Sequence, residues 1–150
     1  MKPAITVCLG FVCCAFAGCE AGPQSGKGFT LPEGNAAAGK EVFVAFNCHE
    51  CHTVSGVELP QPEQVAEKQV RIGGEVTRIQ TYGELVTSVI NPSHKLASGY
   101  RQQDVADEGE SKMTNYNEAM TVAELIDVVA FLQSRYKLKP YEPTNYPLYY

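Results

Sequence analysis

The sequence predicts a small, mainly helical domain, and three segments with helical patterning support this prediction. The first begins at Asn35, the second covers residues 83–90, and the third begins at Thr121. Residues 69–79 alternate polar and β-branched side chains instead, which predicts a small β-hairpin inserted between the helices. At 150 residues the chain has room for one such domain with extensions at its termini.

Residues 1–18 are typical of a secretory signal peptide, because Lys2 is followed by an apolar run too short for an ordinary membrane-spanning helix. Small residues directly before Cys19 resemble the bacterial lipobox, in which that cysteine carries a lipid anchor and becomes the mature N-terminus. Phe16 stands where the lipobox usually has leucine, so a plain export signal is the alternative. Residues 19–34 then form the lipid anchor and a flexible tether, since they are rich in Gly, Pro, Ser and Gln.

The first helix is predicted from Asn35, a favourable N-cap that is followed by three alanines, the strongest helix formers. Gly39, Phe43 and Phe46 recur on one face of this helix. Glycine lowers helix propensity, so we expect Gly39 at a point where another backbone approaches closely.

Residues 48–52 form the motif C-x-x-C-H, which attaches c-type haem. In this motif the thiols of Cys48 and Cys51 bond to the haem vinyl groups, and His52 binds the iron as the proximal ligand. A redox dithiol would lie beside a βαβ pattern, and half a zinc site would need a second ligand pair. The other cysteines all lie at or before Cys19. The sequence therefore predicts one covalently attached haem c.

Two features beside this motif are also predicted. An iron-binding histidine usually donates its second ring N–H to a backbone carbonyl, and the proline-rich loop at residues 59–62 offers the candidate acceptor for His52. His49 lies between the two cysteines, too close to reach the iron, and we expect it to be solvated.

The hairpin is predicted because residues 69–72 and 75–79 are separated by two glycines, with an irregular loop as the alternative. The next helix, residues 83–90, should stop at Asn91, because a residue before proline is disfavoured in the helical region.

A polar loop, residues 98–112, leads to Met113 and the third helix. Thr121 and Glu124 form a capping box ahead of that helix. Its apolar face comprises Leu125, Val128, Val129 and Leu132. Residues 137–150 contain several prolines among tyrosines, so we expect an extended tail on the domain surface.

Residues 35–136 resemble the small single-haem cytochrome c family, in its class I-like form. The resemblance rests on the first helix with Gly39, the attachment motif, a methionine-containing loop and a final helix with Phe131. It implies an all-α fold wrapped around one haem, with the first and last helices crossing at glycine and aromatic residues. It also implies Met113 as the distal iron ligand, although Thr114 stands where the family usually has proline.

Three side chains compete for that ligand position. Met113 matches the ligand of the family, Met120 lies where the family commonly has a core leucine, and we expect His94 at the surface. If His52 and Met113 both bind the iron, no coordination position is left for a substrate. A thioether ligand also raises the reduction potential relative to two imidazoles.

We therefore expect a one-electron carrier rather than an enzyme, held through Cys19 on the periplasmic side of a bacterial cytoplasmic or outer membrane. Its partners would be periplasmic or membrane redox proteins. The alternatives are a haem subunit docked to a larger oxidoreductase through residues 137–150, and an open-site haem sensor or catalyst. A net charge of −5 without a Lys/Arg cluster excludes nucleic acid as a partner. The sequence leaves the oligomeric state open.

Overall fold

The computed structural model describes residues 25–140, and the helical domain within this range begins at Leu31. The preceding unit contributes residues 25–30, in which the Phe29 N–H donates to the Gly26 carbonyl at 3.0 Å. The predicted signal peptide, the predicted lipid site Cys19 and residues 141–150 lie outside the described residues. In the described part of the chain, every helix is too short or too polar to cross a membrane.

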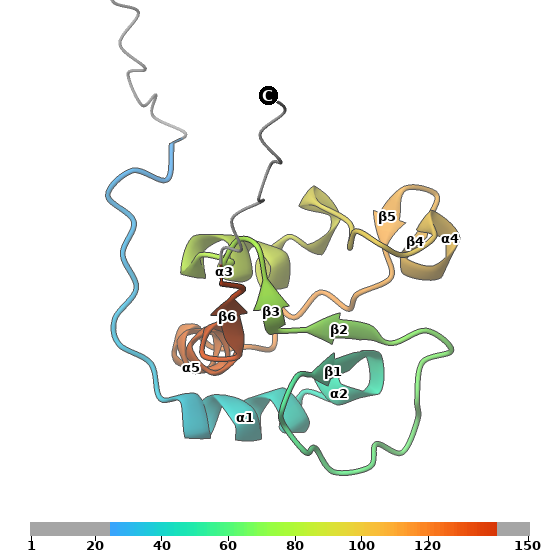
Figure 1. Ribbon diagram of the computed structural model, residues 1–150, viewed down its shortest axis with the longest axis horizontal. Coiled ribbons are helices and arrows are strands. Elements are labelled where there is room, and N and C mark those ends of the chain that lie inside the picture. The colour runs from blue at the N-terminus through green and yellow to red at the C-terminus, as the bar shows by residue number, and fades with distance from the viewer. Residues whose placement is uncertain (1–24, 141–150) are drawn as a thin grey trace, which may run out of the picture. The chain divides into compact units, whose positions relative to one another are not determined.

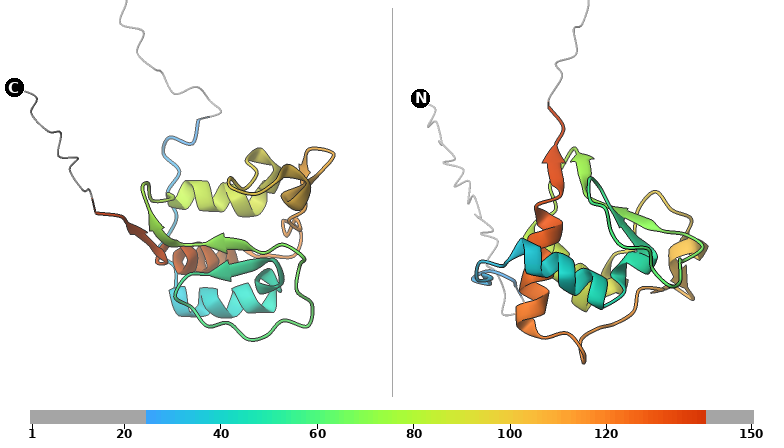
Figure 2. Two further views of the ribbon diagram at one scale, coloured as in Figure 1. Left: turned by 45° about the vertical axis from the view of Figure 1, so that its right-hand side comes forward. Right: turned by 90° about the horizontal axis from the view of Figure 1, so that it is seen from below.

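The first and last helices of the domain, α1 (Ala36–Ala45) and α5 (Val122–Gln133), pack against each other and cross (Figure 1; Figure 2, right). As predicted, Asn35 caps α1, and its side chain accepts from the N–H groups of the next turn at 3.0 and 3.2 Å. The predicted capping box precedes α5, where Thr121 and Glu124 bond to each other's backbone. Both helices therefore begin where the sequence places their caps.

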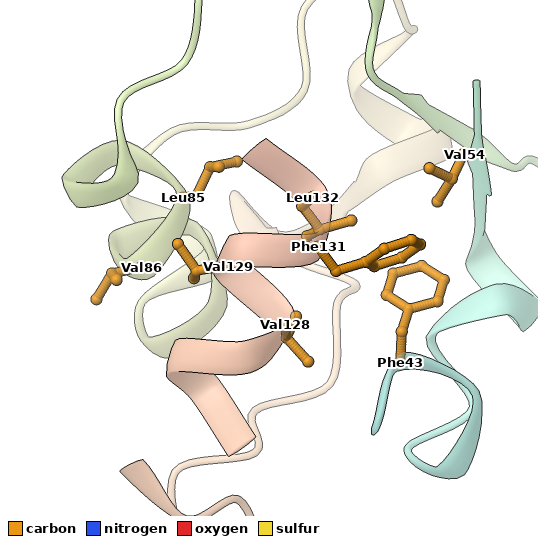
Figure 3. Close-up of a cluster of buried hydrophobic side chains, with 8 residues drawn as sticks. All are labelled: Phe43, Val54, Leu85, Val86, Val128, Val129, Phe131 and Leu132. Atoms are coloured by element: carbon orange, nitrogen blue, oxygen red, sulfur yellow. The ribbon is translucent and has the colours of Figure 1, made fainter. Parts of the chain in front are cut away.

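The crossing point is Gly39, as the sequence predicts. A Cβ atom on Gly39 would lie only 1.9 Å from the carbonyl oxygen of Asp127 in α5. The two backbones can touch only because glycine has no side chain there. One turn further along α1, the ring of Phe43 meets the ring of Phe131 edge to face, with centroids 5.7 Å apart (Figure 3).

A third helix, α3 (Tyr82–Ile90), packs on α5 and completes the core. Thr81 and Glu84 form a capping box at its start, and it ends at Asn91 before Pro92, as predicted. The core side chains shared by these helices and the first strand are Phe43, Val54, Leu85, Val86, Val128, Val129, Phe131 and Leu132 (Figure 3). Each contributes about 1.5–3 kcal/mol by its burial.

Two of the strand pairs described join segments that are distant in sequence. Strand β1 (His52–Val54) pairs in parallel with β2 (Val70–Ile72). Strand β3 (Gly74–Val76) pairs in parallel with β6 (Tyr136–Leu138), so the first two residues of the predicted tail are extended, as expected.

The predicted hairpin at residues 69–79 is therefore wrong, because β2 and β3 pair with other strands and not with each other. The two glycines serve a different purpose. The Gly74 N–H donates to the Arg135 carbonyl at 2.9 Å, and a Cβ on Gly73 would lie 2.9 Å from that same oxygen. Gly73 and Gly74, with φ of 77° and 93°, let the chain pass close to the end of α5 and change strand partners.

An antiparallel pair forms instead in the segment that the sequence assigns to a loop. After the 3₁₀ turn η1 (Pro92–His94) come a short helix, α4 (Gln102–Val105), and strands β4 (Ala106–Asp107) and β5 (Glu110–Ser111). Both linking residues have positive φ, 46° for Glu108 and 91° for Gly109, as in a tight hairpin turn. The fold is nonetheless mostly helical with small strands, so the predicted fold class is confirmed.

Candidate haem-attachment site

The attachment motif forms a single helical turn, α2 (Cys48–Cys51), directly after α1. Phe46 and Asn47 separate the two helices, and the φ of Asn47, 55°, is a left-handed conformation that asparagine adopts more readily than most residues. Cys48 packs against the core, whereas Cys51 is exposed, and both are free thiols. The sequence thus places two thiols on one turn, one packed against the core and one at the surface.

The electrostatics of these thiols argue against a redox dithiol. Burial raises the pKa of Cys48 to about 11, and burial together with the neighbouring Glu50 raises the pKa of Cys51. A dithiol that exchanges disulfides needs a lowered pKa, because the thiolate is the nucleophile. Within residues 25–140 there is also no cluster of three or more His, Cys, Asp or Glu side chains that could hold a zinc ion.

A backbone carbonyl orients the His52 ring. Its Nδ1 lies 3.2 Å from the carbonyl oxygen of Val70, and because a carbonyl can only accept, Nδ1 carries the proton in this bond. Burial lowers the pKa of His52, which favours the neutral ring. A neutral ring that donates from Nδ1 keeps the lone pair of Nε2 for a metal. These donor atoms fit a covalently attached haem.

The prediction that a carbonyl of residues 59–62 accepts from His52 is wrong. The parallel pairing of β1 with β2 sets His52 opposite Val70, so the carbonyl comes from beyond the proline-rich loop. No local pattern in the sequence marks Val70 for this role.

The expectation that His49 is solvated is also wrong. Its side chain is 6 % exposed, and its Nδ1 has no hydrogen-bond partner in the described residues. The end of the long loop folds back over α2, since the Gln69 side chain donates to the carbonyls of His49 and Glu50, and the Ala66 N–H donates to Glu50. The sequence does not predict that the loop covers α2, because this contact depends on how the loop folds.

The loop that carries Met113 is tied to the attachment turn through Tyr116. The Tyr116 hydroxyl donates to the carbonyl of Phe46 at 3.0 Å, and the two rings meet edge to face with centroids 5.5 Å apart. Phe46 lies two residues before Cys48. Burial, and then the nearby Cys48, raises the pKa of the Tyr116 hydroxyl. Met113 itself is half-buried, and its N–H donates to the Ser111 hydroxyl at 3.2 Å.

The side chains of the two competing ligands, Met120 and His94, make other contacts. Met120 lines an apolar pocket of about 330 Å³ between the end of α3 and the start of α5, together with Ile90 and Leu125. His94 is exposed, as expected, and its Nδ1 lies 2.8 Å from the carbonyl of Asn91 in its own turn. Tyr116 also lines this pocket, and its carbonyl accepts from the Met120 N–H at 2.8 Å, so Tyr116 contacts the segments of both methionines.

Comparison with known proteins identifies the family. The family model for cytochrome c matches residues 36–135. The chain belongs to the cytochrome c family. A search of curated proteins and a search of solved structures returned no match. The cytochrome c fold and the family predicted from the sequence are thus confirmed.

Membership of the cytochrome c family, together with Cys48, Cys51 and His52, implies one covalently attached haem c. This confirms the predicted cofactor. Haem iron changes its charge by one electron, so the domain functions in haem-based electron transfer. Cytochromes c are typically non-enzymatic carriers that act outside the cytoplasm and exchange electrons with other redox proteins.

Proposed function

We propose that this cytochrome c domain is a one-electron carrier in which Cys48 and Cys51 bond to the haem and His52 and Met113 bind the iron. The observation that carries the proposal is the hydrogen bond from His52 to Val70, at 3.2 Å, in the parallel pair of β1 with β2. It holds the ring in the tautomer that binds iron, one residue after the second attachment thiol.

Met113 is favoured as the distal ligand by the contacts of its loop. Tyr116, three residues further on, bonds to the carbonyl of Phe46 beside the attachment turn. The Ser111 N–H donates to the Ser93 hydroxyl at 3.0 Å, so the other side of the Met113 loop is also fixed. Met120 lines a pocket between helices, and His94 is exposed. With His52 and Met113 in place, both axial positions are filled, which suits electron transfer rather than catalysis at the iron.

Cys51, one of the two proposed attachment residues, has an exposed side chain. A redox partner can approach there without a large interface, since transient electron-transfer contacts bury less than about 1,200 Å². We therefore propose that periplasmic or membrane redox proteins exchange electrons at this edge of the domain.

Covalent attachment is tested by Cys51→Ala, which should leave at most one thioether bond. We expect the reduced α-band to shift and the yield of haem-containing protein to fall, because one anchoring bond is lost. The measurement is a visible spectrum and a haem stain after denaturing electrophoresis, beside wild type and Ser55→Ala, which leaves the motif intact. An unchanged spectrum and yield in Cys51→Ala would refute the proposal.

We also propose that Cys19 carries the lipid anchor and that residues 19–34 tether the domain to the periplasmic side of a membrane. Three acyl chains, at about 0.8 kcal/mol per buried CH₂, hold a protein essentially permanently, whereas one chain does not. Cys19→Ser in the native host should therefore move the protein from the membrane fraction to a soluble one, as followed by immunoblot. A wild-type protein that already fractionates as soluble would contradict the anchor.

A further inference from the structure

We propose that Tyr100 lowers the reduction potential of this cytochrome by polarising the peptide group that hydrogen-bonds to His52. The inference rests on the proposed function, in which His52 is the proximal ligand. Tyr100 acts through the 70–71 peptide and not on the iron itself, so we assign it as a positioning and tuning residue.

Two hydrogen bonds meet on one peptide group. The carbonyl of Val70, which accepts from His52 at 3.2 Å, and the N–H of Arg71 belong to the same planar unit. That N–H donates to the hydroxyl oxygen of Tyr100 at 2.9 Å. A continuous chain of hydrogen bonds therefore runs from the His52 ring through the 70–71 peptide to the Tyr100 hydroxyl.

The geometry of β2 explains why the two bonds lie on opposite sides of the strand. The carbonyl groups of Val70 and Ile72 face β1, where they accept from His52 and from the N–H of Ser55 at 2.9 Å. The N–H of Arg71 therefore faces away from β1, where the edge of a two-stranded sheet leaves backbone donors without a strand partner. Tyr100 supplies the acceptor that a third strand would otherwise provide.

Tyr100 is held in this place by its neighbours. It lies between η1 and α4, and Arg101, the next residue, forms a two-pronged ion pair with Asp104 at 2.8 and 3.0 Å. The Lys68 ammonium lies 5.7 Å from the centre of the Tyr100 ring. Tyr100 thus reaches the edge of β2 that faces away from β1.

The expected effect follows from hydrogen-bond cooperativity. When a peptide N–H donates to a hydroxyl, electron density moves toward its carbonyl oxygen, and the carbonyl becomes a stronger acceptor by roughly 10–30 %. A stronger acceptor draws the proton of His52 Nδ1 and makes the ring a more basic ligand. A more basic ligand stabilises oxidised iron more than reduced iron, so Tyr100 lowers the reduction potential.

Tyr100→Phe tests the proposal, because it removes the hydroxyl oxygen and keeps the ring. In the haem-containing protein we expect the reduction potential to rise, with the oxidised-to-reduced ratio at a fixed solution potential falling about threefold. At 59 mV per tenfold for one electron, that change equals about 28 mV. In the reduced protein, the NMR signal of the His52 Nδ1 proton should move upfield, because its hydrogen bond is weaker.

Ser55→Ala is the matched control, since it removes the 2.8 Å bond between Ser55 and the Arg71 side chain but leaves the 70–71 peptide intact. It weakens contacts of the same strand pair but leaves the hydrogen bonds that link Tyr100 to His52 unchanged. A higher potential and a shifted proton signal in Tyr100→Phe alone support the proposal. Equal shifts in both variants, or none in Tyr100→Phe, overturn it. A wild type without covalent haem would instead refute the proposed function.

Discussion

Met113→Ala is expected to lower the reduction potential by about 0.1 V or more, within the range over which axial ligands tune haem. The variant loses the thioether that favours reduced iron. The methionine-to-iron charge-transfer band of the oxidised protein should disappear, and the reduced protein should bind carbon monoxide at the vacated position. Potentiometry and visible spectra, with and without carbon monoxide, measure these changes.

Met120→Ala is the control for this result. Its half-buried side chain lines the pocket between α3 and α5, so its loss should cost about 2 kcal/mol of stability and leave the band in place. If Met113→Ala keeps the band while Met120→Ala or His94→Ala loses it, the ligand assignment is wrong. If the wild type binds carbon monoxide readily, an open-site sensor or catalyst replaces the carrier.

Gly39→Ala should destabilise the domain by about 3 kcal/mol, at the upper end of the usual cost of overpacking. The new methyl group would lie 1.9 Å from the Asp127 carbonyl oxygen and 2.9 Å from the Cβ of Phe131, so α1 and α5 must move apart. Alanine gains only about 1 kcal/mol in helix propensity, which is too little to compensate. Denaturant unfolding of the haem-containing protein measures the change.

Gly83→Ala makes the same substitution in α3, where the nearest atom to the new methyl group, the Thr81 hydroxyl oxygen, is 3.9 Å away. This control should stabilise the protein by about 0.5–1 kcal/mol, because only the backbone effect remains. Equal effects of the two substitutions would show that the close approach at Gly39 does not limit packing.

The helices and the attachment turn could be predicted because their signals are local. Asn35, Thr121 and the turn at Asn91 mark helix ends within a few residues, and Gly39 marks a close approach by its cost to the helix. The residue types and spacing of the motif at residues 48–52 are enough to predict haem attachment. Each of these features needs only the residues next to it.

The strand partners and the environment of His52 could not be predicted, because they depend on distant parts of the chain. Alternation at residues 69–79 indicates extended structure but does not name a partner, and the true partners are His52 to Val54 and Tyr136 to Leu138. The Val70 carbonyl follows from that pairing. The burial of His49 and the position of Tyr100 depend on how long loops fold, which short sequence patterns do not predict.

The crossing of α1 with α5 also determines when the domain can assemble. The attachment turn follows α1 directly, but α5 lies far beyond it in the chain, so the core closes only after that long stretch is available. Until then Cys48 lacks the packing that raises its pKa to about 11. Its thiol is more reactive in the open chain than in the closed one. We therefore expect haem attachment to precede the packing of α5 against α1, so that the core forms around a haem that is already bound.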